Sequence, residues 1–126
     1  MLNIPEGILC TRLHSWVLED NNIFYVGITD WQVNQLGDIV SVELPEIGSC
    51  FNKNEVFTTI ESVRDACELY MPVECEIVEI NDKLINFPEL INENCYENWI
   101  AKIKPQNFQQ DTEDLIEYVD YIDEAS

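Results

Sequence analysis

The chain has 126 residues, of which 46% are hydrophobic, and a net charge of -19 at pH 7. A chain of this length can bury about two-thirds of its unfolded surface, enough for one domain over residues 1–126. The hydrophobic content excludes general disorder, and the charge disfavours nucleic acids and anionic membranes as partners. No stretch reaches the roughly 18 apolar residues of a membrane span. The charge either suits docking on basic patches of larger proteins or serves solubility alone.

The amino-terminal residues and the cysteines indicate a reducing compartment. The stretch MLNIPEGILC has neither the basic region nor the apolar core of a secretory signal. The five cysteines are widely spaced without a C-x-x-C motif, and the chain has a single histidine. A disulfide framework and a zinc site are therefore both disfavoured. We expect a cytoplasmic protein if the source is bacterial and a mitochondrial-type matrix protein if it is eukaryotic.

Turn residues divide the chain into short segments that are rich in β-branched and aromatic side chains. Apolar and polar residues alternate in VSVEL (40–44) and EIVEI (76–80), as they do in half-buried strands. The predicted strands cover residues 23–28, 39–44, 56–63 and 76–80. Short strands with frequent turns are typical of a small all-β sandwich or barrel.

Helical signals occur at three places between and after these strands. The pair Thr29-Asp30 offers an N-cap for the segment 31–36, and Gly37 is a suitable residue just past its end. Pro88 favours the start of a short helix in FPELI. Near the end of the chain, apolar residues recur at helical spacing with acids between them, which predicts a helical segment over about 107–124. Those apolar residues are Leu115, Ile116, Val119 and Ile122.

The stretch TTIESVRDACELYMPV (58–73) contains an unexpected basic residue. Two half-buried strands meet there around Arg64 and Asp65, so this pair is predicted to lie at the tip of a hairpin. The whole chain has only six basic residues. Arg64 is therefore either a recognition residue that presents a positive charge to a partner or a solvated turn residue without a role.

Several stretches occur together in a characteristic order and spacing. They are HSW (14–16), VGIT (26–29), LGDIVSVELPEIG (36–48), ESV (61–63), LYMPV (69–73), EIVEIN (76–81), PELIN (88–92) and WIAKIKP (99–105). In these stretches the sequence resembles the H protein family of the glycine cleavage system over nearly its whole length. The resemblance implies a mainly β fold, a flattened barrel-sandwich hybrid of the lipoyl/biotinyl type with short helices and a carboxy-terminal helix.

The resemblance also implies a function. Members of the family carry a lipoyl group on a lysine, receive an aminomethyl group from a pyridoxal-phosphate decarboxylase, and present it to an aminomethyltransferase and a dihydrolipoamide dehydrogenase. The carrier catalyses nothing by itself. These three enzymes, or a lipoate ligase, are the implied partners, and we expect a monomer.

At the position of the carrier lysine, directly after ESV, this sequence has Arg64. Acylation requires a neutral amine, whereas a guanidinium stays protonated, with a pKa above about 12, and its lone pairs are delocalised. We therefore expect that no lipoyl group is attached and that the chain has no cofactor.

Two further positions depart from the family pattern. The family has His-Glu-Trp near the amino terminus, where its glutamate helps to hold the lipoyl arm in a cleft, and this chain has His14-Ser15-Trp16. Glu68 lies four residues past the tip, where the family often has aspartate. His14, Ser15 and Glu68 are thus the candidates for the arm cleft, and His14 is otherwise expected to pack beside Trp16 with a hydrogen bond to backbone.

The second departure is Cys75, which replaces the glycine that usually precedes the EIV strand. A glycine there would permit a positive φ or a close backbone approach. The cysteine implies that the turn is remodelled or that the position tolerates β geometry.

Three functional hypotheses follow. The first is a non-lipoylated H-protein-like docking or regulatory module in glycine or lipoate metabolism, acting through the hairpin. The docking hairpin consists of Glu61, Ser62, Val63, Arg64 and Asp65. The second is a working aminomethyl carrier with an unorthodox lipoyl attachment. The third is a thiol-based activity at Cys67, which the neighbouring acids Asp65 and Glu68 oppose.

Overall fold

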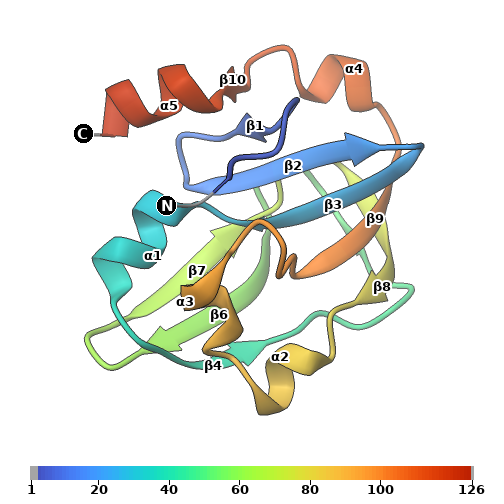
Figure 1. The fold of residues 1–126 in the computed structure, drawn as a ribbon. Helices are drawn as coiled ribbons and strands as arrows, with labels where there is room; N and C mark the ends of the chain where they lie inside the picture. Colours follow the sequence, from blue (N-terminus) through green and yellow to red (C-terminus); the bar gives the residue numbers. More distant parts are fainter. Residues whose placement is uncertain (1–2, 126) are drawn as a thin grey trace.

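The computed structural model describes residues 3–125 and is built from two antiparallel sheets (Figure 1). The larger sheet has seven strands in the order β10-β1-β2-β3-β9-β8-β5, and the smaller has the order β4-β6-β7. The strands of the larger sheet are β1 (Leu9–Cys10), β2 (Ser15–Asp20), β3 (Ile23–Ile28), β5 (Cys50–Phe51), β8 (Cys75–Ile80), β9 (Ala101–Pro105) and β10 (Ile116–Glu117). The strands of the smaller sheet are β4 (Ile39–Glu43), β6 (Val56–Ser62) and β7 (Ala66–Tyr70).

Five short helices surround the sheets within residues 3–125. They are α1 (Asp30–Leu36), α2 (Lys83–Asn86), α3 (Leu90–Glu93), α4 (Phe108–Asp111) and α5 (Tyr118–Ala125). In Figure 1, α4 and α5 run across the top beside β1 and β2, and α2 lies at the bottom near β4. The two sheets remain open rather than closing into one barrel. The predicted mainly β fold with short helices and a carboxy-terminal helix is confirmed in this open form.

The four strands predicted from alternation correspond to β3, β4, β6 and β8, with bounds that agree within one residue. The first predicted helix is α1. The hydroxyl oxygen of Thr29 accepts a hydrogen bond from the Gln32 backbone N–H at 3.4 Å, and Gly37 follows the helix with φ 77°. This is the cap geometry that the sequence predicts. The helix predicted at Pro88 begins two residues later, as α3.

The prediction of one helical segment over 107–124 is wrong in its middle. The side chain of Thr112 donates a hydrogen bond to the Phe108 carbonyl at 2.7 Å at the end of α4. The chain then forms β10, in which Ile116 lies opposite Cys10 in β1. Strand pairing satisfies the backbone groups of the β1 edge, and this interaction outweighs the local helical pattern.

Trp16 and Gly27 show how closely the core of the larger sheet is packed. The two residues are cross-strand partners in β2 and β3. Trp16 is fully buried, and its indole N–H donates a hydrogen bond to the Ile28 carbonyl at 2.9 Å. A Cβ atom on Gly27 would lie only 2.6 Å from the Trp16 ring. Glycine is therefore required at this position, because the tryptophan ring occupies the space of a side chain.

Cys75 adopts ordinary β geometry at the start of β8, opposite Phe51 and Pro105, and is buried. Of the two expectations for this position, tolerance of β geometry is therefore the correct one. All five cysteines are free thiols. Over residues 3–125 the structure contains no group of three or more potential metal-binding side chains, and no helix there is long and apolar enough to span a membrane.

Candidate functional site

The predicted hairpin is confirmed, and its turn is fixed by the side chain of Ser62. Strands β6 and β7 pair up to Glu61 and Ala66. The Ser62 hydroxyl oxygen accepts hydrogen bonds from the backbone N–H groups of Arg64 at 3.1 Å and Asp65 at 3.0 Å. The tip is also attached to the residue that precedes β4, because the Val63 N–H donates to the Asp38 carbonyl at 3.0 Å. The five residues 61–65 therefore form an ordered turn.

The guanidinium of Arg64 lies across the carboxy-terminal end of α1. Its Nη1 atom donates a long hydrogen bond of 3.5 Å to the Gln35 carbonyl. A Cβ atom on Gly37 would approach the Arg64 Nε atom to 3.3 Å, so the glycine leaves room for this side chain. The last turn of α1 contains no basic residue of its own. Arg64 thus supplies the positive charge that a helix terminus favours, although at an exposed site this contributes under about 1 kcal/mol.

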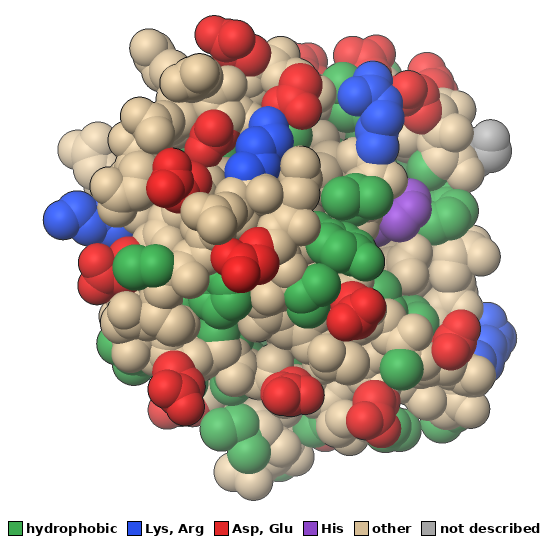
Figure 2. All heavy atoms as spheres, turned by 180° about the vertical axis from the view of Figure 1, so that it is seen from behind, with side chains coloured by type: hydrophobic (Ala, Val, Ile, Leu, Met, Phe, Trp, Pro, Cys, Tyr) green, Lys and Arg blue, Asp and Glu red, His purple; other side chains and the backbone are tan. Residues whose placement is uncertain are grey.

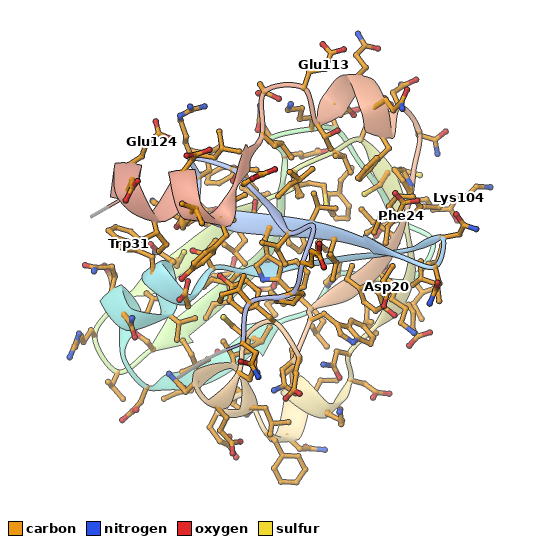
Figure 3. All side chains as sticks on the ribbon, turned by 45° about the horizontal axis from the view of Figure 1, so that its top comes forward. Asp20, Phe24, Trp31, Lys104, Glu113 and Glu124 are labelled. Carbon is orange, nitrogen blue, oxygen red and sulfur yellow. The ribbon has the colours of Figure 1, made fainter. Side chains whose placement is uncertain are left out.

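His14 packs differently from the sequence-based expectation. Its ring stacks on Trp31 of α1 with centroids 4.6 Å apart, not on Trp16, which is buried against Tyr96. Its Nδ1 atom is 2.7 Å from the Tyr121 hydroxyl, so the hydrogen-bond partner is a side chain rather than backbone. The expectation was wrong because Trp16 points into the core while His14, with φ 74°, turns toward α1 and α5. Trp31 lies between these two helices in Figure 3.

Burial lowers the pKa of His14 below the value of about 6.5 of a free histidine side chain. The folded state therefore favours the neutral ring, and its contribution to stability is present above pH 6.5 and is lost as the pH falls through the lowered pKa. The chain has a single histidine, so its ring resonances in a proton NMR titration are unambiguous. We expect a midpoint clearly below 6.5. A midpoint at or above that value would contradict the buried, neutral ring.

Ser15 is fully buried and connects the two sheets, so it does not line an open cleft. Its hydroxyl donates a hydrogen bond of 2.8 Å to the carbonyl of Tyr70 in β7, and it lies 3.1 Å from the Thr11 hydroxyl. In this structure Ser15 is therefore a structural residue between β2 and β7. The arm-cleft role of Ser15 stays a prediction, and in this structure the hydrogen-bond partners of its hydroxyl are internal.

Replacing Ser15 with alanine should lower the free energy of unfolding by about 1–2 kcal/mol, because the Tyr70 carbonyl would lose its buried donor. Ser41, which is exposed on β4, is a matched control, and Ser41→Ala should change stability by less than about 0.5 kcal/mol. Chemical denaturation of the wild-type chain and the two variants measures the differences in the free energy of unfolding. Equal stabilities of the two variants would show that the bridge between the sheets contributes nothing.

Cys67 and Glu68 follow the tip on β7 and face different environments. Glu68 is exposed opposite Thr59, whereas Cys67 is half-buried, and its sulfur accepts a hydrogen bond from the side-chain amide of Gln32 at 3.3 Å. Burial raises the pKa of the Cys67 thiol, and Asp65 and Glu68 raise it further, although the Gln32 hydrogen bond opposes this. The thiol is therefore mostly protonated at neutral pH, which disfavours reactivity.

Helix α1 is the element that the predicted site residues share. It contacts Arg64 through Gln35, Cys67 through Gln32 and His14 through Trp31. It does not bring Ser15 or Glu68 into the same surface. The sequence-based site omitted these helical residues, because the cap signals and Gly37 predict a helix but not its position beside the hairpin. The Arg64 side chain is exposed, and its guanidinium lies against the end of this helix.

The family model for the glycine cleavage H-protein matches residues 8–125, which is nearly the whole chain. The chain belongs to the glycine cleavage H-protein family. It is therefore a carrier-type protein rather than a catalyst.

Individual relatives agree with this assignment. The chain is 44% identical over 124 residues to the probable glycine cleavage system H protein of Pyrococcus furiosus, covering 94% of this chain and 92% of that protein. It is 43% identical over 128 residues to the glycine cleavage system H protein of Herpetosiphon aurantiacus, covering 100% and 99% of the two chains. Among solved structures, an H protein from Mycobacterium marinum superposes with a TM-score of 0.84 at 27% identity, covering 96% of this chain and 98% of that one.

Proposed function

We propose that this H-protein family member is not lipoylated and acts as a docking or regulatory module in glycine or lipoate metabolism through the hairpin of residues 61–65. The observation that carries this proposal is Arg64 at the tip, where the family resemblance places the acceptor lysine. A guanidinium cannot supply the neutral amine that acylation needs. The residues of this tip therefore do not fit a lipoyl group, and no step that depends on one is assigned to them.

The four lysines of the chain occupy other parts of the fold. Lys53 donates hydrogen bonds to the Asp111 carbonyl and the Asp114 carboxylate, and Lys102 forms an ion pair with Glu79 at 3.2 Å. Lys83 begins α2, and Lys104 lies on β9. No lysine stands at the tip of the β6–β7 hairpin. Their placement argues against a carrier with an unorthodox attachment, and the raised pKa of Cys67 argues against a thiol activity.

The hairpin is suited to docking because it is ordered before any partner binds. The Ser62 hydrogen bonds fix the turn, and Val63 is 67% exposed beside the charged Arg64. A preformed turn loses little conformational freedom on binding. The proposed partners are the enzymes of the glycine cleavage system, namely the pyridoxal-phosphate decarboxylase, the aminomethyltransferase and the dihydrolipoamide dehydrogenase, or a lipoate ligase. We propose that the chain meets them as a monomer.

The intact mass of the protein purified from its native cells tests whether it is modified. We expect the mass of the unmodified chain. A mass increment of one lipoyl group would overturn the proposal, and peptide mapping would then identify the attachment residue.

Binding and turnover test the docking role separately. We expect the purified chain to bind at least one of the four partner enzymes from its own organism, and Val63→Asp to weaken that binding. As the sole H protein, it should support no glycine–bicarbonate exchange. Exchange at carrier-like rates would contradict the docking role, and so would the absence of binding to all four enzymes.

A further inference from the structure

A groove of about 740 Å³ is lined by residues of β3, β8, β9 and α4. In Figure 1, β8 and β9 lie on the side of the molecule away from the β6–β7 turn. The residues that matter here are Ile23 and Phe24 from β3, Val78 and Glu79 from β8, Lys102 and Lys104 from β9, and Phe108 from α4. Figure 3 shows Phe24 and Lys104 at the same end of the sheet, close to Asp20. This volume is within the range of pockets that hold ligands or peptide side chains.

Part of the groove surface is apolar and in contact with water. The rings of Phe24 and Phe108 pack with centroids 4.8 Å apart. Next to them Ile23 is 42% exposed and Val78 is 44% exposed. Clustered exposed apolar side chains of this kind often mark interaction sites, because a partner that covers them removes the unfavourable free energy of their hydration.

The groove also holds two of the six basic residues of the chain. The Lys102 amine is already engaged, because it pairs with Glu79 at 3.2 Å and lies 5.1 Å from the centre of the Trp99 ring. Lys104 is different. It is exposed and lies opposite Glu76 in the β8–β9 register, yet it makes no ion pair within residues 3–125. Lys104 thus leaves a positive charge without a partner at the rim of an apolar groove.

A groove with a lysine that is unpaired within residues 3–125 is unusual in a chain with a net charge of -19. The chain has 25 acidic residues, and acidic side chains are spread over the face in Figure 2, where basic ones are few. An anionic partner is repelled over most of such a surface. Among the charged side chains that line the groove, Lys102 and Glu79 compensate each other, so Lys104 gives the lining an excess of one positive charge, with Glu76 opposite it on β8 outside the lining. A carboxylate would therefore find its favourable position beside Lys104.

We propose that this groove docks an extended segment of a partner protein in which a carboxylate stands next to a large apolar side chain. The carboxylate pairs with Lys104, and the apolar side chain covers Ile23, Val78 and the Phe24–Phe108 pair. In this mode the apolar contacts provide most of the affinity, and the ion pair sets orientation and specificity. The groove is separate from the hairpin, so the proposal does not depend on lipoylation or on the docking function of residues 61–65.

The test is an amide NMR titration of the full chain with the probe peptide acetyl-Glu-Phe-Asp-Leu-amide. We expect saturable shifts confined to the groove residues of β3, β8, β9 and α4, with a Kd near 1 mM, as befits a small contact area. Lys104→Gln should weaken binding about fivefold, and Val78→Ser should weaken it by a similar factor. Lys83→Gln is the matched control, because Lys83 also lacks an ion pair in residues 3–125 but lies on α2. It should leave binding unchanged.

Four outcomes would overturn the proposal. The first is the absence of saturable shifts in the groove up to about 5 mM peptide. The second is equal binding of the uncharged peptide acetyl-Gln-Phe-Asn-Leu-amide, which would remove the role of Lys104. The third is tighter binding of octanoate than of the peptide, which would identify a small amphiphile as the occupant. The fourth is a concentration-dependent shift of the same residues without peptide, which would identify a second copy of the chain.

Discussion

Arg64→Lys is expected to convert a protein that a lipoate ligase leaves unmodified into one that the ligase modifies to completion. The expected change is this large because the two side chains differ in kind: a lysine can expose a neutral amine, whereas an arginine cannot. The turn that presents position 64 depends on Ser62 and on the Val63–Asp38 contact, and the substitution alters neither. Lysine also keeps a positive charge near the end of α1. Intact mass after incubation with the ligase, ATP and lipoate measures the result.

Arg12→Lys is the control for this experiment. Arg12 is the other arginine of the chain, and it forms an exposed ion pair with Glu124 at 3.1 Å, far from the hairpin in sequence. This variant should remain unmodified. An unmodified Arg64→Lys protein would mean that the surface recognised by the ligase has also diverged, since the acceptor would then be present without effect. The departure of Ser15 from the family's glutamate is one place where such divergence is already visible.

Gly27→Ala should lower the free energy of unfolding by about 2–3 kcal/mol. The added Cβ atom would lie 2.6–2.8 Å from three atoms of the Trp16 ring. The ring cannot move aside easily, because it is fully buried and its N–H is held by the Ile28 carbonyl. Urea denaturation should give a lower midpoint with an unchanged slope, which is the signature of a change in stability alone.

Gly48→Ala serves as the comparison for this second prediction. It adds the same methyl group at a position with φ 89° where no atom lies within 4 Å of the new Cβ. This variant should lower the free energy of unfolding by about 1 kcal/mol, through backbone strain alone. If the two variants were equally stable, the close contact between Trp16 and Gly27 would not be the cause of the effect.

Strands and helices whose signals are local could be predicted from the sequence. Segments 40–44 and 76–80 are predicted as strands from their apolar residues, of which Val42 and Ile77 are buried, whereas a register shift in each strand leaves Val40 and Val78 exposed. Thr29 and Gly37 define α1 through cap geometry that depends on adjacent residues. The tip at Arg64 was found for the same reason, since the turn lies between two alternating segments. Each of these features is determined within about ten residues of chain.

The features that could not be predicted depend on residues distant in sequence. Ile116 is in a strand because Cys10 lies opposite it, 106 positions earlier in the chain. His14 stacks on Trp31 and forms a hydrogen bond with Tyr121, and the residues next to His14 in the sequence indicate neither contact. The family resemblance suggested an arm cleft at Ser15, but only the structure places its hydroxyl between the two sheets. A tertiary contact overrode the local helical pattern at Ile116, and tertiary contacts alone determine where the His14 and Ser15 side chains lie.

The pairing of β1 with β10 has a consequence for how the protein is made. Residues 9 and 10 are synthesised about a hundred residues before their strand partners at 116 and 117. The buried Tyr121, whose hydroxyl is 2.7 Å from the side chains of both His14 and Thr29, arrives later still. During synthesis the first strand therefore keeps an unpaired edge, the kind of surface on which nascent chains aggregate. Native folding is completed only when the final helix is released, so a stalled or truncated chain lacks the last strand and the tyrosine that cover this edge.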